Sequence, residues 1–243
     1  MKLQKNGVFY SVVATWTTNV VPRQFWTTFA KERLVKLLWI YQRILTSMLE
    51  YELQMQKEGY RYIAGIDEAG RGPLAGPVVV ASVVMPLDNL IEGINDSKKL
   101  SAKKRDMLYD KIISQALDYH VAIISPKVID DINILNATKQ GMLECIDGLK
   151  QVDCVLIDAV KLQTDVKTLS IIHGDALSYS IAAASILAKV TRDRLMLEYD
   201  KQYPQYNFAK HKGYGTAEHI KLLKEHGPCE IHRRSFIGHF VEV

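Results

Sequence analysis

Acidic side chains lie at the ends of three short apolar stretches that have the composition of buried strands. One stretch leads to Asp67 and Glu68, the second to Asp158 and the third to Asp175. Strand ends meet at the edge of a sheet, so we expect these four carboxylates to lie close together. Carboxylates in such a group repel each other and favour protonation, whereas hard divalent cations such as Mg²⁺ prefer carboxylate oxygens as ligands. The pattern therefore predicts a metal-dependent enzyme rather than a simple binding domain.

A glycine-rich loop follows the first acid pair directly. Gly70 and Gly72 allow the backbone to approach a ligand closely, and Arg71 between them carries a planar fork of donors that suits phosphate. The loop is not a P-loop, because no Gly-Lys-Ser/Thr follows, and it lacks the Gly-x-Gly-x-x-Gly spacing of dinucleotide-binding turns. A loop of this kind beside metal-binding acids is suited to holding a phosphodiester near the metal.

The charge of the chain is unevenly distributed along its 243 residues. Residues 1–60 contain eight Lys or Arg and four Asp or Glu, which accounts for the whole net charge of +4. Residues 61–243 contain 23 of each and are neutral, so bulk charge does not indicate a nucleic-acid partner. A local basic excess over residues 205–243 fits either a nucleic-acid patch or a solvated face.

Cysteine usage and hydropathy bear on the compartment. Three cysteines, an odd number without CxxC or zinc spacing, fit structural thiols in a reducing compartment, so we expect a cytoplasmic protein. No uncharged run of about 18 apolar residues occurs, which predicts no membrane span. The stretch from Val8 to Val21 resembles a signal peptide only faintly, because polar residues interrupt it and no clear cleavage site follows.

Strands that alternate with helices predict an α/β domain with a mixed sheet of about five strands. We expect this catalytic domain to span residues 61–243 and an N-terminal extension to span residues 1–60. Apolar residues at steps of three and four predict a helix over 31–57 in the extension, for which partner docking and extra duplex binding stay open as roles. Within the domain we predict strands at 63–68, 78–84, 121–124, 155–158 and 171–175, and helices at 101–117, 136–149, 180–194 and from Thr216 to Gly227.

Several long motifs, in this order, resemble those of bacterial ribonuclease HII. The resemblance covers residues 61–237 and implies a ribonuclease H-like fold, a mixed sheet flanked by helices with a C-terminal helical segment. The motifs are GIDEAGRGPLAG from Gly65, DSKKL from Asp96, AAASILAKVTRD from Ala182, HKGYGT from His211 and HRRSF from His232.

The resemblance also implies an activity. Members of this family hydrolyse the RNA strand of RNA–DNA hybrids and cut on the 5′ side of single ribonucleotides embedded in duplex DNA. The cut leaves 3′-hydroxyl and 5′-phosphate ends and serves ribonucleotide excision repair. Mn²⁺ or Mg²⁺ is the implied cofactor, with two ions during catalysis, and the partners are RNA–DNA hybrids and ribonucleotide-containing duplex DNA. We expect a monomer.

Carried over by position, the family's four catalytic and metal-binding acids fall on Asp67, Glu68, Asp158 and Asp175. As a hypothesis, Asp67 bridges both ions, Asp175 helps to hold the ion that activates water, and the other two acids support the second ion. Adjacent strand residues point to opposite faces, so Asp67 and Glu68 can share a site only at a strand end or bulge. The implied substrate-binding residues are Gly70, Arg71, Gly72 and the junction-sensing Tyr214.

Recognition of a ribonucleotide requires contact with its 2′-hydroxyl. We expect backbone amides around Arg71 and the phenol of Tyr214 to make this contact, with Tyr214 also stacking on the next deoxyribose. Two other functions stay open: a nuclease of the same fold that prefers long hybrids, and a nucleic-acid-binding module without catalysis. The glycines on both sides of Tyr214 favour junction cutting over the first, and the complete set of four acids argues against the second.

Other polar residues near these motifs also have simple structural explanations. We expect Asp193 to pair with Lys189 or with a neighbouring arginine. Lys98 and Lys99 fit either phosphate contacts or a solvated loop. No zinc spacing joins the histidines that are candidates for substrate contacts, which are His173, His211 and His232.

Overall fold

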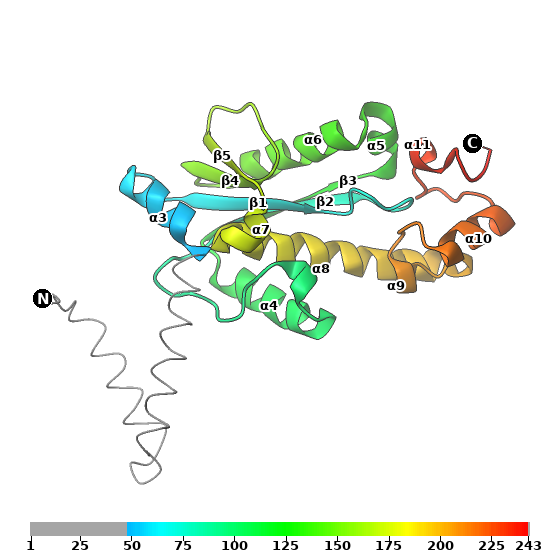
Figure 1. Cartoon of the computed structure of the whole chain (residues 1–243), viewed down its shortest axis with the longest axis horizontal. Coiled ribbons are helices and arrows are strands. Elements are labelled where there is room, and N and C mark those ends of the chain that lie inside the picture. Colours follow the sequence, from blue (N-terminus) through cyan, green and yellow to red (C-terminus); the bar gives the residue numbers. More distant parts are fainter. Residues whose placement is uncertain (1–47, 243) are drawn as a thin grey trace, which may run out of the picture. The chain divides into compact units, whose positions relative to one another are not determined.

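The computed structural model describes residues 48–242, in which a five-stranded mixed sheet separates two layers of helices (Figure 1). The strand order is β3-β2-β1-β4-β5. The pairs β1–β2 and β2–β3 are antiparallel, and the pairs β1–β4 and β4–β5 are parallel, which confirms the predicted mixed α/β sheet. The strands are β1 (Ile63–Ala69), β2 (Val78–Val84), β3 (Asp118–Ile124), β4 (Cys154–Asp158) and β5 (Lys167–Ile171).

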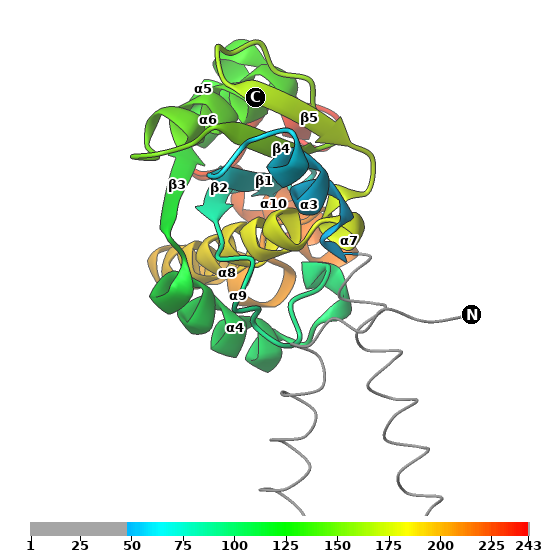
Figure 2. The same cartoon turned by 90° about the vertical axis from the view of Figure 1, so that its left-hand side faces the viewer.

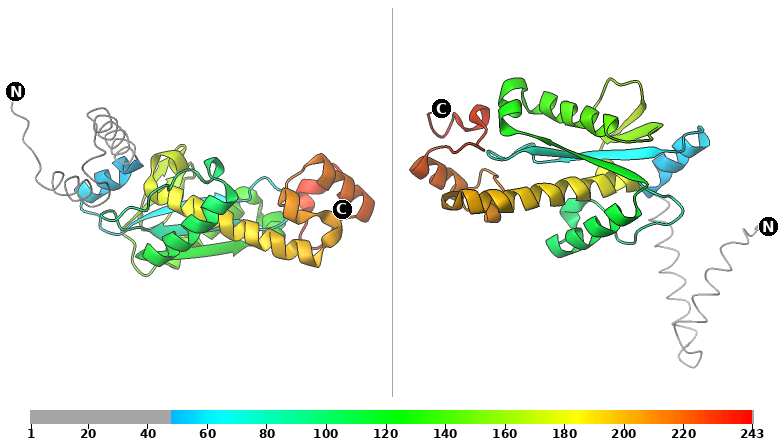
Figure 3. Two further views of the ribbon diagram at one scale, coloured as in Figure 1. Left: turned by 90° about the horizontal axis from the view of Figure 1, so that it is seen from below. Right: turned by 180° about the vertical axis from the view of Figure 1, so that it is seen from behind.

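Helices α5 and α6 cover one face of the sheet, and α8 with α4 lies on the other (Figures 1 and 2). At the far end of α8, away from α3, the chain forms a group of short elements that includes α9 and α10 (Figure 3). The helices are α3 (Glu50–Lys57), η2 (Ser97–Lys99), α4 (Ala102–Gln115), α5 (Pro126–Ile132), α6 (Ile134–Asp147), α7 (Gly174–Leu177), α8 (Tyr179–Gln202), η3 (Pro204–Tyr206), α9 (Phe208–His211), α10 (Ala217–His226) and α11 (Arg234–Ile237).

Strand β2 shows why the sheet has helices on both faces. All seven of its residues are buried, as its continuous β-branched sequence predicts. Val79, Ala81 and Val83 pack in the cluster that includes the small residues of α8. Val80 and Val84 point to the other face and pack with residues of α6. Side chains therefore alternate between two separate cores.

Caps confirm three of the predicted helix boundaries, whereas the helix predicted over 180–194 is longer than expected and continues to Gln202. The Ser101 hydroxyl accepts from the backbone of Lys104 at the start of α4, and the Thr216 hydroxyl accepts from the backbone of His219 at the start of α10. Gly227 ends α10 at a φ of 73°. The sequence pattern does not predict α5, a seven-residue helix that is too short to show a clear apolar period.

Helix α8 lies unusually close to the central strand because Gly65 has no side chain. A Cβ atom at Gly65 would lie 2.0 Å from the carbonyl carbon of Ser180, at the start of α8. The Cβ would clash with backbone, which cannot move aside as a flexible side chain would. Gly65 therefore sets the separation between β1 and the N-terminal end of α8.

Substitution Gly65→Ala is expected to destabilise the fold by about 3 kcal/mol, the upper part of the usual range for overpacking. Urea denaturation would measure the change in unfolding free energy. Gly72→Ala is the matched control, because no atom lies within 4 Å of a Cβ at that position and its φ is not positive. Equal stability of the two variants would contradict this account of the β1–α8 contact.

Part of the predicted N-terminal extension packs against the catalytic domain. The helix predicted over 31–57 lies outside the described residues except for its last part, which forms α3. Glu52 of α3 is fully buried, and its carboxylate accepts from the Ser178 hydroxyl at 2.6 Å and from the Ser180 backbone at 2.9 Å. These two donors lie at the N-terminal end of α8, so the carboxylate of Glu52, from another helix of the same chain, caps α8. None of the helices in the described part of the chain is long and apolar enough to cross a membrane.

Candidate active site

Three of the four predicted acids meet at one end of the sheet. One carboxylate oxygen from each of three residues, Asp67, Asp158 and Asp175, lies within 4.8 Å of the other two. Ile66 of β1 pairs with Ile157 of β4, so the next residues, Asp67 and Asp158, stand side by side. Parallel pairing of β1 with β4 therefore brings the first two acids together.

The strand-end prediction needs two corrections. Strand β1 continues to Ala69, because its pairing with β2 runs on after its pairing with β4 has ended, so Asp67 lies inside the strand. Strand β5 ends at Ile171, and the chain then turns through His173, at a φ of 59°, into the short helix α7. Asp175 therefore comes from the first turn of α7 and not from a strand.

A backbone hydrogen bond fixes this turn against the acid group. The Gly174 backbone N–H donates to Asp158 Oδ1 at 2.8 Å, one residue before Asp175. The space is narrow, because a Cβ at Gly174 would lie 2.6 Å from the Ile181 side chain. The turn thus holds Asp175 beside Asp158.

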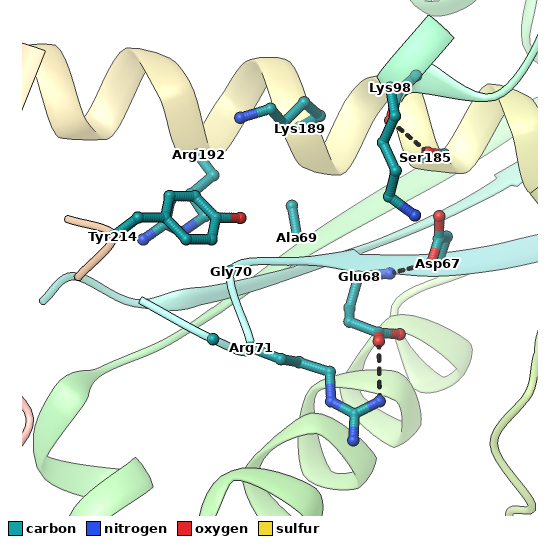
Figure 4. A pocket seen from close by; sticks show the side chains of 12 residues that line it. Asp67, Glu68, Ala69, Gly70, Arg71, Lys98, Ser185, Lys189, Arg192 and Tyr214 are labelled. Atoms are coloured by element: carbon teal, nitrogen blue, oxygen red, sulfur yellow. Dashed lines mark hydrogen bonds and ion pairs between the residues drawn. The ribbon is translucent and has the colours of Figure 1, made fainter. Parts of the chain in front are cut away.

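Glu68 is the one predicted acid outside this three-carboxylate group. Neighbouring strand residues point to opposite faces, and Glu68 Oε1 accepts from Arg71 Nη1 at 3.3 Å, away from Asp67 (Figure 4). Its other oxygen, Oε2, is buried and has no hydrogen-bond partner among the described residues. An unsatisfied buried carboxylate oxygen is costly, so this atom suits a further ligand.

The acids are held in an environment that disfavours their charge. Burial raises the pKa of Asp67 well above its usual value of 3.8, and the charges of Glu68 and Asp158 raise it further. Burial also raises the pKa of Glu68 and of Asp158. Lys98 Nζ offsets part of the negative charge, at 3.2 Å from Asp175 Oδ2. A group of acids with a buried oxygen that lacks a hydrogen-bond partner in the described part of the chain suits a hard divalent cation. The cation would replace the repulsion between the carboxylates by attraction to its own charge.

The raised pKa of Asp67 predicts a pH-dependent stability difference in metal-free protein. At a pH between 3.8 and the raised pKa, the carboxyl of Asp67 is protonated in the folded state and ionised in the unfolded state. Above this pH window the ionised carboxylate destabilises the folded state, and this destabilisation is lost as the pH falls through the window. In EDTA at neutral pH, Asp67→Asn is therefore expected to unfold at a higher urea concentration than wild type.

This advantage should shrink as the pH falls through the raised pKa of Asp67, because the wild-type carboxyl then becomes protonated. Comparison of the two proteins cancels the titration of groups that they share. An advantage that grows on acidification would contradict the assigned direction of the shift.

Two of the four acids, Asp67 and Glu68, line a pocket together with the other predicted site residues. Asp67 and Glu68 lie at one end, the loop of Gly70, Arg71 and Gly72 lines the wall, and Tyr214 stands at the other end (Figure 4). The Tyr214 side chain is half exposed. The pocket also contains residues that the sequence reading did not assign to the site, namely Ser97, Ser185, Lys189 and Arg192.

Arg192 connects the loop with the tyrosine. It is fully buried and donates to the carbonyls of Pro77, Ala75 and Lys212 at 3.0 to 3.1 Å. Its guanidinium carbon lies 5.7 Å from the centroid of the Tyr214 ring. Gly70, at a φ of 96°, packs on it so tightly that a Cβ would lie 2.0 Å from Arg192 Nε. No local sequence signal marks an arginine whose partners are carbonyls of distant segments.

The structure decides several minor expectations. Asp193 pairs with Lys189 at 2.6 Å, as predicted, and Lys98 pairs with Asp175. His211 and His232, two of the three candidates for substrate contacts, are buried, and their rings pack among aromatic residues of the C-terminal elements. His173 is exposed.

Comparisons with known proteins agree with this geometry. Residues 64–239 match the family model of ribonuclease HII. The ribonuclease HII of Ruminiclostridium cellulolyticum is 58% identical to this chain over 200 residues, which are 82% of this chain and 78% of that protein. A ribonuclease HII of Bacillus cereus is 55% identical over 190 residues, 78% of this chain and 74% of that protein.

Solved structures show the same fold. The ribonuclease H2 of Pyrococcus horikoshii OT3 superposes with a TM-score of 0.63 at 27% identity, covering 72% of this chain and 93% of that one. The ribonuclease HII of Archaeoglobus fulgidus, solved in complex with PCNA, gives a TM-score of 0.62 at 26% identity, covering 72% and 94%. The chain therefore belongs to the ribonuclease HII family, whose members are divalent-metal-dependent ribonucleases H that act on RNA–DNA substrates.

Proposed function

We propose that this ribonuclease H cuts duplex DNA on the 5′ side of a single embedded ribonucleotide and also cuts the RNA strand of RNA–DNA hybrids, leaving 3′-hydroxyl and 5′-phosphate ends. One observation carries the proposal: Asp67 of the acid group lines the same pocket as Glu68, the glycine-arginine-glycine loop and Tyr214 (Figure 4). A site that hydrolyses the backbone and a group that senses the adjoining sugar are thus within reach of one bound strand.

The acids are the proposed catalytic and metal-binding residues. Asp67, Asp158 and Asp175 are the first three, supported by their mutual distances, and Glu68 is the fourth, supported by its buried unsatisfied oxygen. Two Mg²⁺ or Mn²⁺ ions, when bound, would supply water activation and charge relief at the phosphoryl and leaving oxygens. The chain contributes by fixing the acids on β1, β4 and α7, so that little reorganisation accompanies the reaction.

The proposed substrate-binding residues are Gly70, Arg71, Gly72 and Tyr214. Arg71 is close to half exposed, and its guanidinium fork suits a phosphate of the bound strand. The phenol of Tyr214 is accessible for stacking on a sugar and for hydrogen bonding to a 2′-hydroxyl.

We extend the proposal to the setting of the enzyme. The protein acts as a monomer with an extension at residues 1–60 and a catalytic domain at residues 61–243. The three cysteines, Cys145, Cys154 and Cys229, are free thiols, which supports a reducing cytoplasm as its compartment. Nicks with a 3′-hydroxyl would serve ribonucleotide excision repair.

The test is cleavage of an end-labelled DNA duplex that contains one ribonucleotide, with Mg²⁺, Mn²⁺ or EDTA. We expect one metal-dependent cut on the 5′ side of the ribonucleotide. Degradation of a long hybrid without this cut would replace the proposal by a general hybrid nuclease. Binding of both substrates without cleavage would mean that the four acids do not form a working site.

A further inference from the structure

Two buried histidines form a hydrogen-bonded contact behind Tyr214. His219 lies in α10 and His232 lies just before α11, and both side chains are almost completely inaccessible. Their Nε2 atoms are 3.1 Å apart. The other nitrogen of His219, Nδ1, is 2.9 Å from the carbonyl oxygen of Tyr214. His219 therefore connects His232 with the main chain of the proposed sensing residue.

The neighbouring groups determine the tautomer of each ring. A carbonyl only accepts, so His219 Nδ1 must donate to Tyr214, and in a neutral ring its Nε2 must then accept. His232 Nε2 therefore donates to His219. His232 Nδ1 is left as the acceptor, which agrees with the Cys229 backbone N–H that donates to it at 3.0 Å. One continuous relay thus runs from Cys229 through both histidines to Tyr214.

A third histidine supports the same loop. His211 Nε2 donates to the carbonyl of Tyr206 at 2.7 Å, and its Nδ1 accepts from the Gly213 backbone N–H at 3.2 Å. The His211 ring stacks on the His219 ring, with centroids 4.3 Å apart. The backbone on both sides of Tyr214 is therefore anchored to buried imidazoles.

The residue after His232 holds the facing wall of the pocket. Arg233 is fully buried and donates to the carbonyls of Gly70 at 2.6 Å, Arg71 at 2.9 Å and Gly76 at 2.9 Å. His232 itself forms an isolated antiparallel bridge with Ala75, in the same loop. Two consecutive residues thus link the tyrosine on one side of the pocket with the glycine loop on the other.

We propose that His219 and His232 are positioning residues that hold Tyr214 at a fixed place relative to the glycine loop, so that the preference for single ribonucleotides depends on their relay. The inference rests on the proposed sensing role of Tyr214. Neither histidine reaches the pocket, so neither contacts substrate. Displacement of the tyrosine by a fraction of an ångström would weaken discrimination, because orientation effects are steep.

The surroundings keep both rings neutral, as the relay requires. Burial lowers the pKa of each histidine to about 4. The titratable groups that face them are His211 of α9, Tyr206 of η3, Cys229 and Arg234. His211 lowers the pKa of both rings, and Arg234 lowers that of His232. Protonation of His219 would place an N–H group opposite the Nε2–H of His232, and protonation of His232 would place one opposite the backbone N–H of Cys229. Either event would break one hydrogen bond of the relay, which is therefore intact at neutral pH.

Nitrogen-15 NMR of the full-length protein at neutral pH tests the relay directly. We expect His219 to carry its proton on Nδ1 and His232 to carry its proton on Nε2. Assignment of the two signals follows from the single substitutions described below. A protonated Nε2 on His219, or a cationic ring at either position, would overturn the relay.

The functional test compares two substitutions at His219. His219→Asn places an amide donor near the position of Nδ1, whereas His219→Gln places its amide near Nε2 and leaves the Tyr214 carbonyl without that donor. The readout is the ratio of kcat/KM for a single-ribonucleotide duplex to kcat/KM for a long hybrid. We expect His219→Gln to lower this ratio about tenfold, the effect of one lost buried hydrogen bond. We expect His219→Asn to lower it less, because the donor to the Tyr214 carbonyl is kept and only the acceptor for His232 Nε2 is lost.

Controls separate this role from general loss of structure. His226→Leu changes an exposed histidine of the same helix and should leave the ratio unchanged. An equal loss on both substrates in His219→Gln, or an unchanged ratio, would overturn the positioning role. Tyr214→Ala is measured in parallel. If Tyr214→Ala keeps the wild-type ratio, the proposed sensing function of Tyr214 itself fails. If Tyr214→Ala lowers the ratio but His219→Gln does not, only the relay is refuted.

Discussion

Substitution Asp67→Asn is expected to lower the turnover of ribonucleotide cleavage by roughly 10³-fold, the scale on which loss of a central electrostatic group acts. Asp67 contributes one of the three carboxylate oxygens that lie within 4.8 Å of one another, and a carboxamide neither carries charge nor binds a hard cation well. Its shape is almost that of aspartate, so packing around β1 is retained. Single-turnover cleavage with Mg²⁺ would measure the loss.

Asp106→Asn is the matched control for this experiment. Asp106 is an exposed aspartate of α4 that pairs with Arg194 at 3.2 Å and lies outside the pocket. Its variant is expected to cleave within about twofold of wild type, because exposed ion pairs contribute little. Near-normal turnover in Asp67→Asn would remove this aspartate from the metal site, whatever the behaviour of the control.

Substitution Tyr214→Ala is expected to lower cleavage at a single embedded ribonucleotide by about 10²-fold, because the scissile sugar loses its orientation. Binding to the same duplex should weaken much less, since the glycine loop and Arg71 remain in place. Cleavage within a long hybrid should also fall less, because 2′-hydroxyl groups flank every cut there. The measurement is kcat/KM on both substrates together with the dissociation constant for the duplex.

Tyr119→Ala provides a comparison for the tyrosine experiment. Tyr119 lies on the edge strand β3, is exposed to a similar degree as Tyr214 and does not line the pocket. This variant should treat both substrates as wild type does. If Tyr214→Ala lost activity equally on every substrate, the tyrosine would be a structural residue and the basis for junction recognition would have to lie elsewhere.

The sequence was sufficient where chemistry follows local pattern. The run of β-branched residues in β2 predicted a strand buried on both faces, and Ser101 and Thr216 marked the starts of two helices. The proximity of Asp67 and Asp158 could also be predicted, because both follow short apolar runs, and these runs pair in parallel in the sheet. Family resemblance then implied the ribonuclease H-like fold.

The sequence was insufficient where position depends on distant contacts. Asp175 was read as a strand end because apolar residues precede it, whereas a left-handed turn at His173 starts α7 instead. Asp67 and Glu68 are neighbours in sequence, yet strand geometry points them apart. No local pattern predicts the burial of Arg192 and Arg233, because their carbonyl partners come from segments far away in the chain.

The buried carboxylate of Glu52 determines what a deletion experiment can report. A variant that begins at residue 61 would lack α3, so the start of α8 would lose the capping carboxylate of Glu52. The start of α8 follows directly after the short helix that carries Asp175. Loss of activity in such a variant would reflect a disturbed metal site and would say nothing about duplex affinity. A variant that begins at Met48 keeps every contact of α3 described above, so the salt dependence of its DNA binding would report on the preceding residues alone.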